Sequence, residues 1–258
     1  MSDFKILTDR DHILMRPNMY IGSVDKENIS AIVNFEYKDL TIVPGLLKIT
    51  NEIIDNSVDE AIRTNFKFAN EIDVNIKYEE LLNDWVISVS DNGRGIPSVK
   101  YGEIYQAEAA WTQAKSGTSF SDNRTTIGAN GVGSFCTNVF SKEFIGISND
   151  GKLEITVSCE DSCNPEKTKV TAEPVRGSNT GTMIWFKPNL TLFNINTITD
   201  DHIEIIKDRL INLSICYPKI KFRFNGGAIA PGTMNSIAKK FDKDAVAFSF
   251  GDIKIVVG

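Results

Sequence analysis

The sequence predicts an α/β (α+β) fold, a two-layer sandwich in which helices cover one face of a mixed sheet of about eight strands. Three observations lead to this expectation. The stretch from Leu46 to Arg63 carries apolar residues at helical spacing. Between residues 71 and 186, short stretches alternate apolar and polar residues, as half-buried strands do. Further helical and strand patterns continue to residue 257, so the two kinds of element are mixed along the chain.

The composition is that of a soluble globular protein. Of the 258 residues, 41% are hydrophobic, which is enough for a substantial core, and 24% are charged. The net charge of −6 argues against a surface that is basic throughout, although it leaves room for a local basic patch that binds nucleic acid. The apolar runs are too short for a membrane span, and the N-terminus lacks the apolar core of a secretory signal. We therefore expect a cytoplasmic protein.

Cysteine and histidine are too sparse for several common kinds of site. The cysteines show no paired C-x-x-C spacing, so a zinc site is not expected. The histidines are few and far apart, which argues against a Ser/His/Asp triad or a Cys/His pair. In a cytoplasmic protein the cysteines are most simply reduced packing residues. The residues concerned are Cys136, Cys159, Cys163, Cys216, His12 and His202.

The N-terminal segment shows little periodicity. Residues 1–13 are polar and mixed, as in an arm. Residues 16–22, RPNMYIG, are rich in turn formers and carry two apolar anchors, Met19 and Ile21. Residues 23–45 leave helix and strand open, and Pro44-Gly45 predicts a break before the next element.

Residues 46–63, LLKITNEIIDNSVDEAIR, predict one amphipathic helix. Its apolar residues form one stripe, and its polar residues recur about one turn apart on the other side. The polar side is typical of a solvated surface, or of a binding site where other motifs support one. The apolar stripe consists of Leu46, Ile49, Ile53, Ile54, Val58, Ala61 and Ile62, and the polar side of Glu52, Asn56, Asp59, Glu60 and Arg63.

The middle of the chain predicts hairpins and short helices. A turn at Asn83-Asp84 separates two strands, and a turn at residues 149–151, Asn-Asp-Gly, separates two more. A polar loop at residues 116–126 is long enough to act as a lid, and a helix is expected after Gly133. The expected strands are residues 71–78, 85–90, 142–147, 152–159, 167–172 and 181–186, and a further helix is expected at residues 100–115.

The composition shifts near residue 198, and we expect a first domain at residues 1–197 and the beginning of a second at residues 198–258. Within the second part the patterns predict a helix at 198–217, a strand at 219–224, a short helix at 233–242 and a hairpin of strands 245–250 and 252–257 across Gly251. The chain then stops without a polar tail, as if the second domain had only begun.

Two glycine motifs carry possible chemistry. In residues 91–97, DNGRGIP, a carboxylate follows a strand and two glycines follow it. Such a segment is often only a loop, but a buried Asp91 could accept a hydrogen bond from an exocyclic amine such as that of adenine, and glycines let the backbone approach a ligand. In residues 128–133, GANGVG, a glycine-rich turn opens a helix, which suits phosphate binding. The glycine order matches neither a Rossmann fingerprint nor a Walker A loop.

The helix could supply the rest of a nucleotide site. Glu52 and Asn56 are four residues apart and share a face. An amide oxygen can complete a Mg²⁺ shell whose other ligands are phosphates and waters. A carboxylate one turn earlier could deprotonate a water that attacks a γ-phosphate.

In this order, the helix and the two glycine motifs resemble the GHKL ATPase superfamily, which has the Bergerat type of ATP-binding fold. The superfamily includes type II topoisomerases, a heat-shock chaperone, sensor histidine kinases and mismatch-repair ATPases. The pattern is most similar to gyrase B-like ATPase regions of type II topoisomerases, and within them to the large ATPase subunit of tailed-phage enzymes. The similar segments are RPNMYIG, EIIDNSVDEA, DNGRGIP, GANGVGSFCTNVFS and TGTMIWFKP, spread over residues ~5–255.

The resemblance implies ATP and Mg²⁺ as cofactors and assigns a role to each matching residue. Glu52 would be the general base and Asn56 the Mg²⁺ ligand. Asp91 would accept from the adenine amine, beside a water held by Thr182. Glu60 would lie near the site, or else form a salt bridge to Arg94. The adenine side would be lined by Gly93, Arg94, Gly95, Ile96 and Pro97, the phosphates wrapped by Gly128, Ala129, Asn130, Gly131, Val132, Gly133 and Ser134, and the nucleotide covered by Gly117, Thr118 and Ser119.

The resemblance also implies partners and a limit on activity. ATP binding would dimerise two such regions into a clamp around duplex DNA, with the DNA-cleaving tyrosine on another domain or subunit. The N-terminal arm would reach the partner subunit. Relatives carry a lysine for the γ-phosphate in a Gln-Thr-Lys loop of the second, transducer domain, and these 258 residues contain no such loop. We therefore expect nucleotide binding with weak or absent turnover.

Other functions stay open at this point. A mismatch-repair-type ATPase would keep the ATP site, although RPNMYIG and TGTMIWFKP argue against it. A histidine kinase has less support because Glu52 as a hydrolytic base would be out of place. The third possibility is a protein that is not an enzyme, a truncated protein or decoy that binds nucleotide or a host topoisomerase.

Overall fold

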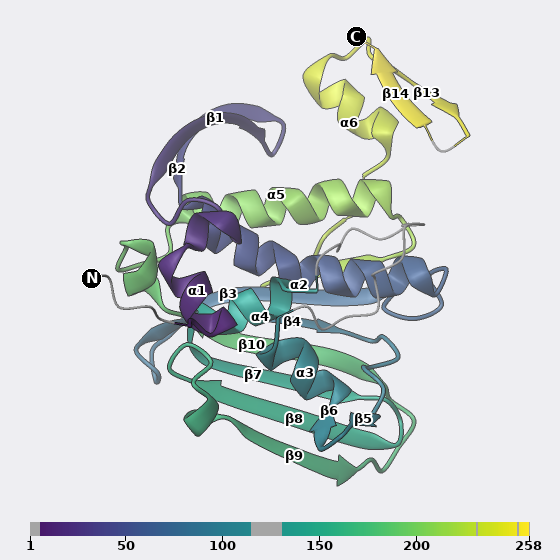
Figure 1. Cartoon of the computed structure of the whole chain (residues 1–258). Helices are drawn as coiled ribbons and strands as arrows, with labels where there is room; N and C mark the ends of the chain where they lie inside the picture. Colours follow the sequence, from purple (N-terminus) through teal and green to yellow (C-terminus); the bar gives the residue numbers. More distant parts are fainter. Residues whose placement is uncertain (1–5, 115–130, 231, 252, 258) are drawn as a thin grey trace.

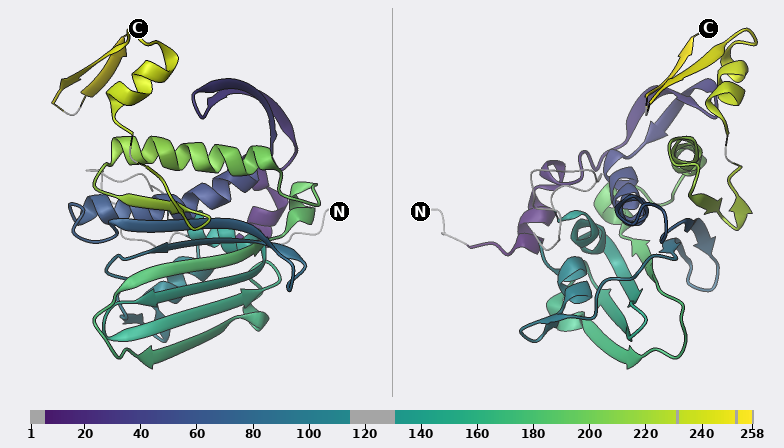
Figure 2. Two further views of the ribbon diagram at one scale, coloured as in Figure 1. Left: turned by 180° about the vertical axis from the view of Figure 1, so that it is seen from behind. Right: turned by 90° about the vertical axis from the view of Figure 1, so that its right-hand side faces the viewer.

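The computed structural model describes residues 6–114, 131–230, 232–251 and 253–257. Its centre is an eight-stranded sheet in the order β12-β11-β3-β4-β10-β7-β8-β9. Within these residues, β11 and β3 are parallel and every other neighbouring pair of the sheet is antiparallel. Helices α2, α3 and α4 lie on one face (Figure 1), and the view from behind in Figure 2 shows the strands in front of them. The predicted two-layer fold with a mixed sheet is confirmed.

The elements follow the order that the periodicity predicts. The strands of the large sheet are β3 (Glu71–Glu79), β4 (Asp84–Asp91), β7 (Ser141–Asn149), β8 (Leu153–Glu160), β9 (Lys169–Pro174), β10 (Gly181–Pro188), β11 (Lys221–Phe224) and β12 (Gly227–Ala228). The helices are α1 (Asp9–Met15), α2 (Pro44–Arg63), α3 (Gln106–Thr112), α4 (Gly133–Val139), α5 (Asp200–Cys216) and α6 (Met234–Phe241). The short hairpins are β1 (Glu27–Val33) with β2 (Glu36–Ile42), β5 (Lys100–Tyr101) with β6 (Ile104–Tyr105), and β13 (Val246–Phe250) with β14 (Ile253–Val257). Single 3₁₀ turns are η1 (Pro17–Met19), η2 (Pro165–Lys167) and η3 (Leu190–Phe193).

Helix α2 packs its apolar stripe on the sheet. Ile49, Ile53, Ile54 and Val58 are each at most 2% exposed. Full burial of one such side chain is worth about 1.5–3 kcal/mol, so the stripe strongly favours one rotation of the helix about its axis. The helix begins two residues earlier than predicted because Pro44 occupies its first turn, where the missing N–H costs nothing.

The sheet supplies the other half of the core. Val74 and Ile76 on β3, and Val89 on β4, are at most 3% exposed, as the alternation of these strands predicts. Phe144 and Phe186, on the neighbouring strands β7 and β10, are fully buried and face each other across the ladder. The strand ends that lie beneath α2 and α4 are thereby held in register.

Residues 27–42, which the sequence left ambiguous, form a hairpin whose edge is held by α5. The backbone N–H of Thr41 donates to Asp201 at 2.8 Å, and that of Asn34 donates to Asp208 at 2.8 Å. Lys38 forms a salt bridge with Glu204 at 2.8 Å. The acids along α5 therefore satisfy backbone donors that an edge strand would leave open.

Helix α5 also holds the beginning of α2. The Nε2 atom of His202 accepts a hydrogen bond from the backbone N–H of Val43 at 2.8 Å, and Nδ1 lies 2.9 Å from the hydroxyl of Thr199. Burial lowers the pKa of His202 to about 4, so the ring is neutral in the folded protein near neutral pH. The interaction satisfies the backbone N–H of Val43, the N-cap residue of α2, while no side chain caps the first turn of the helix.

The described part of the expected arm contains helix α1, on which Ile13 is fully buried. Two local predictions are wrong. Met19 is not an anchor, since it is 72% exposed, whereas Ile21 is buried at 3%. The helix expected at 100–115 begins only at Gln106, because Gly102, with a φ of +65°, makes a tight turn between β5 and β6.

The first elements of the C-terminal region, α5 and β11, pack with α2 and the large sheet. Helix α5 lies beside α2, and β11 pairs in parallel with β3. The division into residues 1–197 and 198–258 stays a prediction, and it would separate elements that share one sheet. Helix α6 and the hairpin β13–β14 project beyond this sheet (Figure 1). No helix in the described residues is long and apolar enough to cross a membrane.

The neutral, buried His202 predicts an acid-sensitive fold. Its pKa is lower in the folded state than the ordinary 6.5, so its contribution is present above pH ~6.5 and is lost as the pH falls toward 4. The loss should reach about 3 kcal/mol in the free energy of unfolding. Urea unfolding between pH 7 and 4.5 should show this loss in the wild type and a smaller one in His202→Gln, whose amide oxygen can accept from Val43 without titrating.

The control is His12→Gln, which changes the other histidine of the chain. It should keep the pH dependence of the wild type. The same pH dependence in wild type and His202→Gln would contradict the assignment.

Candidate functional site

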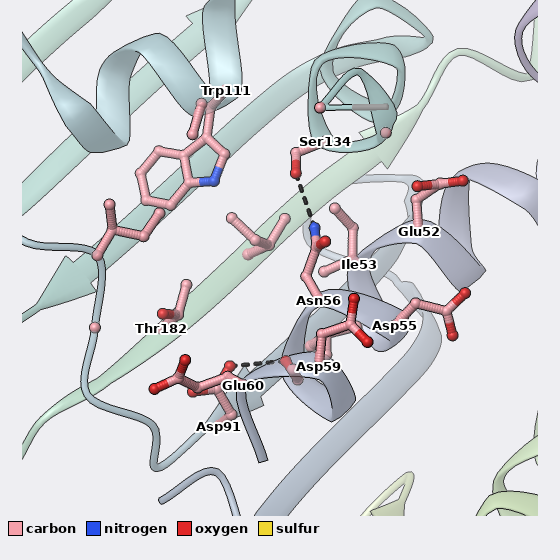
Figure 3. A pocket seen from close by; sticks show the side chains of 18 of the residues that line it. Glu52, Ile53, Asp55, Asn56, Asp59, Glu60, Asp91, Trp111, Ser134 and Thr182 are labelled. Atoms are coloured by element: carbon pink, nitrogen blue, oxygen red, sulfur yellow. Dashed lines mark hydrogen bonds between the residues drawn. The ribbon is translucent and has the colours of Figure 1, made fainter. Parts of the chain in front are cut away.

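A cavity of about 870 Å³ lies between α2, the ends of β4 and β10, and helices α3 and α4. Figure 3 shows side chains from these elements converging on it. All described residues of the sequence-predicted site line it except Gly93. Those that line it are Glu52, Asn56, Glu60, Asp91, Arg94, Gly95, Ile96, Pro97, Gly131, Val132, Gly133, Ser134 and Thr182. The structure therefore brings together three motifs that are far apart in the sequence.

Asp91 is the buried acid of the cavity. It ends β4 and lies opposite Thr182 in the register of β4 and β10. Its carboxylate accepts hydrogen bonds from the Ser57 hydroxyl at 2.7 Å and from the backbone N–H of Gly93 at 2.8 Å. Burial raises its pKa, and these hydrogen bonds oppose the rise. A carboxylate in such a place can take a further donor from a ligand that shields it from water.

The glycines beside Asp91 allow close backbone contacts. A Cβ on Gly93 would lie 2.6 Å from the Asp91 Oδ1 atom. Gly95 has a φ of +71°, and a Cβ there would lie 2.2 Å from the carbonyl oxygen of Asn149. The next backbone N–H, that of Ile96, donates to the Ser148 hydroxyl at 2.6 Å. The motif is thus pressed against the turn between β7 and β8, with no room for side chains at these two positions.

Glu52 and Asn56 lie at the other end of the cavity, on the exposed side of α2. Glu52 forms a salt bridge with Lys48, one turn earlier on the helix. The Asn56 amide nitrogen donates to the Ser134 hydroxyl at 2.9 Å (Figure 3). A Cβ on Gly133 would lie only 1.8 Å from the Glu52 Oε2 atom, so a side chain at this position would displace the Glu52 carboxylate.

The donor set at this end suits a magnesium ion shared with a phosphate. Among the described residues, no three histidine, cysteine or carboxylate side chains gather as a metal-binding group. Asn56 uses its amide nitrogen on Ser134, so its oxygen is the atom that could coordinate. One amide oxygen fits an ion whose other ligands are phosphate and water, as Mg²⁺ prefers.

Glu60 takes part in ion pairs, as the second of its two predicted roles requires. Its carboxylate accepts from Arg94 Nε at 2.7 Å and from Arg63 at 3.2 Å. Because Glu60 is on α2 and Arg94 is in the Asp91 motif, the pair fastens the helix to the loop at the edge of the cavity. Its position near the site is also as expected.

Several lining residues were not predicted. Lys48 could have been found, since it stands four residues before Glu52. Trp111 lines the wall opposite α2 (Figure 3), and Gly146 makes room for it, because a Cβ there would lie 2.4 Å from the indole ring. Ser57, which binds Asp91, and Trp111 carry no pattern that distinguishes them from ordinary helix residues.

Part of the predicted site lies outside the described residues. This holds for the expected lid at 116–126 and for the six positions Gly117, Thr118, Ser119, Gly128, Ala129 and Asn130. Their roles stay predictions.

A comparison with family models decides the family. Residues 42–192 match the model of the histidine kinase-, DNA gyrase B-, and HSP90-like ATPases, and this range is more than half of the chain. The chain belongs to this ATPase family. The matched range contains α2 and both glycine motifs, so the predicted GHKL resemblance is confirmed.

Within this GHKL family the chain is similar to type II topoisomerases. It is 39% identical to the DNA topoisomerase large subunit of Enterobacteria phage T4, over all of this chain and 49% of that protein. It is 31% identical to DNA topoisomerase 2 of Saccharomyces cerevisiae, over 88% of this chain and 16% of that protein. The chain thus spans about half or less of these relatives. The expected likeness to a phage ATPase subunit is confirmed.

Solved structures of type II topoisomerases have a fold similar to that of this chain. The ATPase region of Saccharomyces cerevisiae topoisomerase II matches with a TM-score of 0.84 and 26% identity, over 95% of this chain and 68% of that one. The ATPase and transducer domains of DNA topoisomerase II from Balamuthia mandrillaris match with a TM-score of 0.88 and 25% identity, over 100% of this chain and 69% of that one.

The close backbone contact at Gly95 predicts a large effect of Gly95→Ala. The added Cβ meets the Asn149 carbonyl and the left-handed backbone strains an L-residue, so the free energy of unfolding should fall by roughly 2–5 kcal/mol. Gly102→Ala is the matched control, since it has a φ of +65° and open space around its Cβ, and should cost only about 1–2 kcal/mol. Urea unfolding measures both. Equal costs would show that the contact with Asn149 is not tight.

Proposed function

We propose that the chain binds and hydrolyses ATP as the ATPase region of a type II DNA topoisomerase. The observation that carries the proposal is one cavity that holds the buried Asp91 carboxylate at one end and the pair Glu52 and Asn56 at the other. The family and the topoisomerase relatives support it.

The Asp91 end suits a nucleobase. The carboxylate accepts from two protein donors and can accept a third from the exocyclic amine of adenine. Thr182 lies opposite Asp91 on β10, where it can hold a water between base and protein. Val89, Ile184 and Trp111 supply apolar walls for a planar ring.

The Glu52 end suits phosphates and an attacking water. Asn56 would hold Mg²⁺, which when bound offsets phosphate charge and orients the γ-phosphate. The Glu52 carboxylate can take a proton from a water beside that phosphate. The salt bridge from Lys48 holds the Glu52 carboxylate in place along the cavity wall. The backbone on the phosphate side of the cavity comes from Gly131, Val132, Gly133 and Ser134.

The partners follow from the same proposal. ATP binding would dimerise two such regions into the clamp that captures a DNA duplex, and a DNA-cleaving subunit or domain would complete the enzyme. The likeness to a protein called DNA topoisomerase large subunit in phage T4 supports these partners. A phage-encoded chain of this kind would act in the host cytoplasm, without a membrane. A mismatch-repair-type ATPase is the alternative within the family.

Nucleotide binding tests the roles of Asp91 and Glu52. Calorimetry with a non-hydrolysable ATP analogue and Mg²⁺ should show binding by the wild type and by Glu52→Ala, which lacks only the water-activating group. Asp91→Asn should bind about 10–100-fold more weakly, because its amide cannot accept from the adenine amine in the same way. It should stay folded, since it removes a buried charge and the Ser57 hydroxyl can reverse to accept from it.

Asp84→Asn is the matched control, at the far end of the same strand, and should bind like the wild type. No binding by any of these proteins, the wild type included, would overturn the proposed function. Equal binding by the wild type and Asp91→Asn would remove Asp91 from the base site.

We expect slow turnover from the 258-residue chain. The resemblance assigns contact with the γ-phosphate to a lysine of a Gln-Thr-Lys loop, which these residues lack. Steady-state phosphate release should be slow, only slightly above the background that Glu52→Gln gives. Release as fast as that of a full-length relative, and abolished by Glu52→Gln, would show that the chain needs no such lysine.

A further inference from the structure

We propose that Arg209 of α5 is a positioning residue of the nucleotide cavity, which acts by neutralising Asp55 of α2 so that the phosphate end can accept a polyphosphate. The inference rests on the proposed nucleotide site and adds to it a residue that does not line the cavity.

The cavity has an excess of acid for a site that must hold phosphates. Its lining residues include six carboxylates and four cationic side chains. A nucleoside triphosphate brings about three to four further negative charges. The lining carboxylates are Glu52, Asp55, Asp59, Glu60, Asp91 and Asp150, and the lining cations are Lys48, Arg63, Arg94 and Lys152. Each acid near the phosphates therefore needs local compensation.

Two acids of α2 are compensated from within the cavity lining. Glu52 pairs with Lys48, and Glu60 pairs with Arg63 and Arg94. Asp55 is different, because its partner Arg209 comes from another helix and does not line the cavity. Asp55 lies between Glu52 and Asn56 in the helix and is only 8% exposed, so solvent screens its charge poorly.

The charge of Asp55 acts on the residues that would meet the phosphates. Asp55 lines the cavity itself, directly before Asn56 and three residues after Glu52 on the same helix, and its carboxylate is paired with Arg209. At this separation an uncompensated Asp55 charge would repel both the Glu52 carboxylate and a phosphate beside it. Arg209 offsets this repulsion without placing a side chain in the space that the nucleotide needs.

A contact that serves only helix packing would be built differently. The Nε atom of Arg209 is buried and has no hydrogen-bond partner among the described atoms, which is unfavourable. An apolar pair of similar size at this α2–α5 contact would avoid both that cost and the desolvation of two charges. The ion pair is explained if the Asp55 carboxylate has a function beside the phosphate end and the Arg209 charge offsets the cost of burying it.

Affinities for ligands of different charge separate these roles. Calorimetry should compare adenosine with a non-hydrolysable ATP analogue plus Mg²⁺ on the wild type, Arg209→Met, Asp55→Asn and the double variant. Arg209→Met should weaken binding of the analogue about tenfold, because it leaves the Asp55 charge uncompensated beside the phosphate end. It should leave adenosine within about threefold. The double variant should restore the ratio of the two affinities to the wild-type value.

Lys207→Met is the matched control, since it removes one positive charge from the exposed side of the same helix. It should change neither affinity. Asp55→Asn alone keeps the Arg209 charge and should tighten the analogue but not adenosine. If Arg209→Met does not fold, the affinities of Asp55→Asn alone test the inference.

The outcomes are distinct. Equal losses for adenosine and the analogue in Arg209→Met, or no recovery in the double variant, would assign the pair to helix packing and overturn the inference. An unchanged affinity ratio in Asp55→Asn would do the same. A wild type that binds neither probe would refute the proposed function itself.

Discussion

The burial of one face of α2 against the sheet sets the position of the polar groups that line the cavity from this helix. Ile49, Ile53, Ile54 and Val58 fill the core, and their burial determines the rotation of the helix. Because side chains three and four residues apart share a face, the rotation that buries the isoleucines also directs Glu52 and Asn56 into the cavity. A small change in this packing would move Glu52 and Asn56 together relative to Asp91 on β4.

The cavity contains buried carboxylates, which are unfavourable for the stability of the folded protein. Asp91 is a buried carboxylate whose pKa is raised by burial, and Asp55 and Asp59 are also less than 9% exposed. Such groups lower the stability of the empty protein, and they persist where binding depends on them. The cavity is also tightly packed at residues 93, 95 and 133, where a Cβ would collide with a neighbouring group unless that group moved.

Periodicity and motif spacing predicted the parts of this molecule that depend on local sequence. The stripe of α2, the alternation in β3 and β4, and the turn at residues 149–151 can all be read within about 20 residues. The motifs also predicted which described residues would meet in one cavity, with Gly93 just behind its lining. The sequence could not show the hairpin β1–β2, whose edge depends on acids about 160–174 residues away. It also could not show the pairing of Asp55 with Arg209, 154 residues apart, because nothing local marks either residue.

Helix α5 contacts α2, a helix of the proposed nucleotide site, although α5 lies outside the residues that the family model matches. The family model matches residues 42–192, and the composition suggested a new domain from residue 198. Yet α5 begins at Asp200, accepts a backbone donor at the start of α2 through His202, and supplies the cation for Asp55. The strand that follows, β11, pairs with β3 in the same sheet. Residues beyond the range that the family model matches therefore pack with the cavity through α5 and with its sheet through β11, so the cavity and its supports are not confined to residues 42–192.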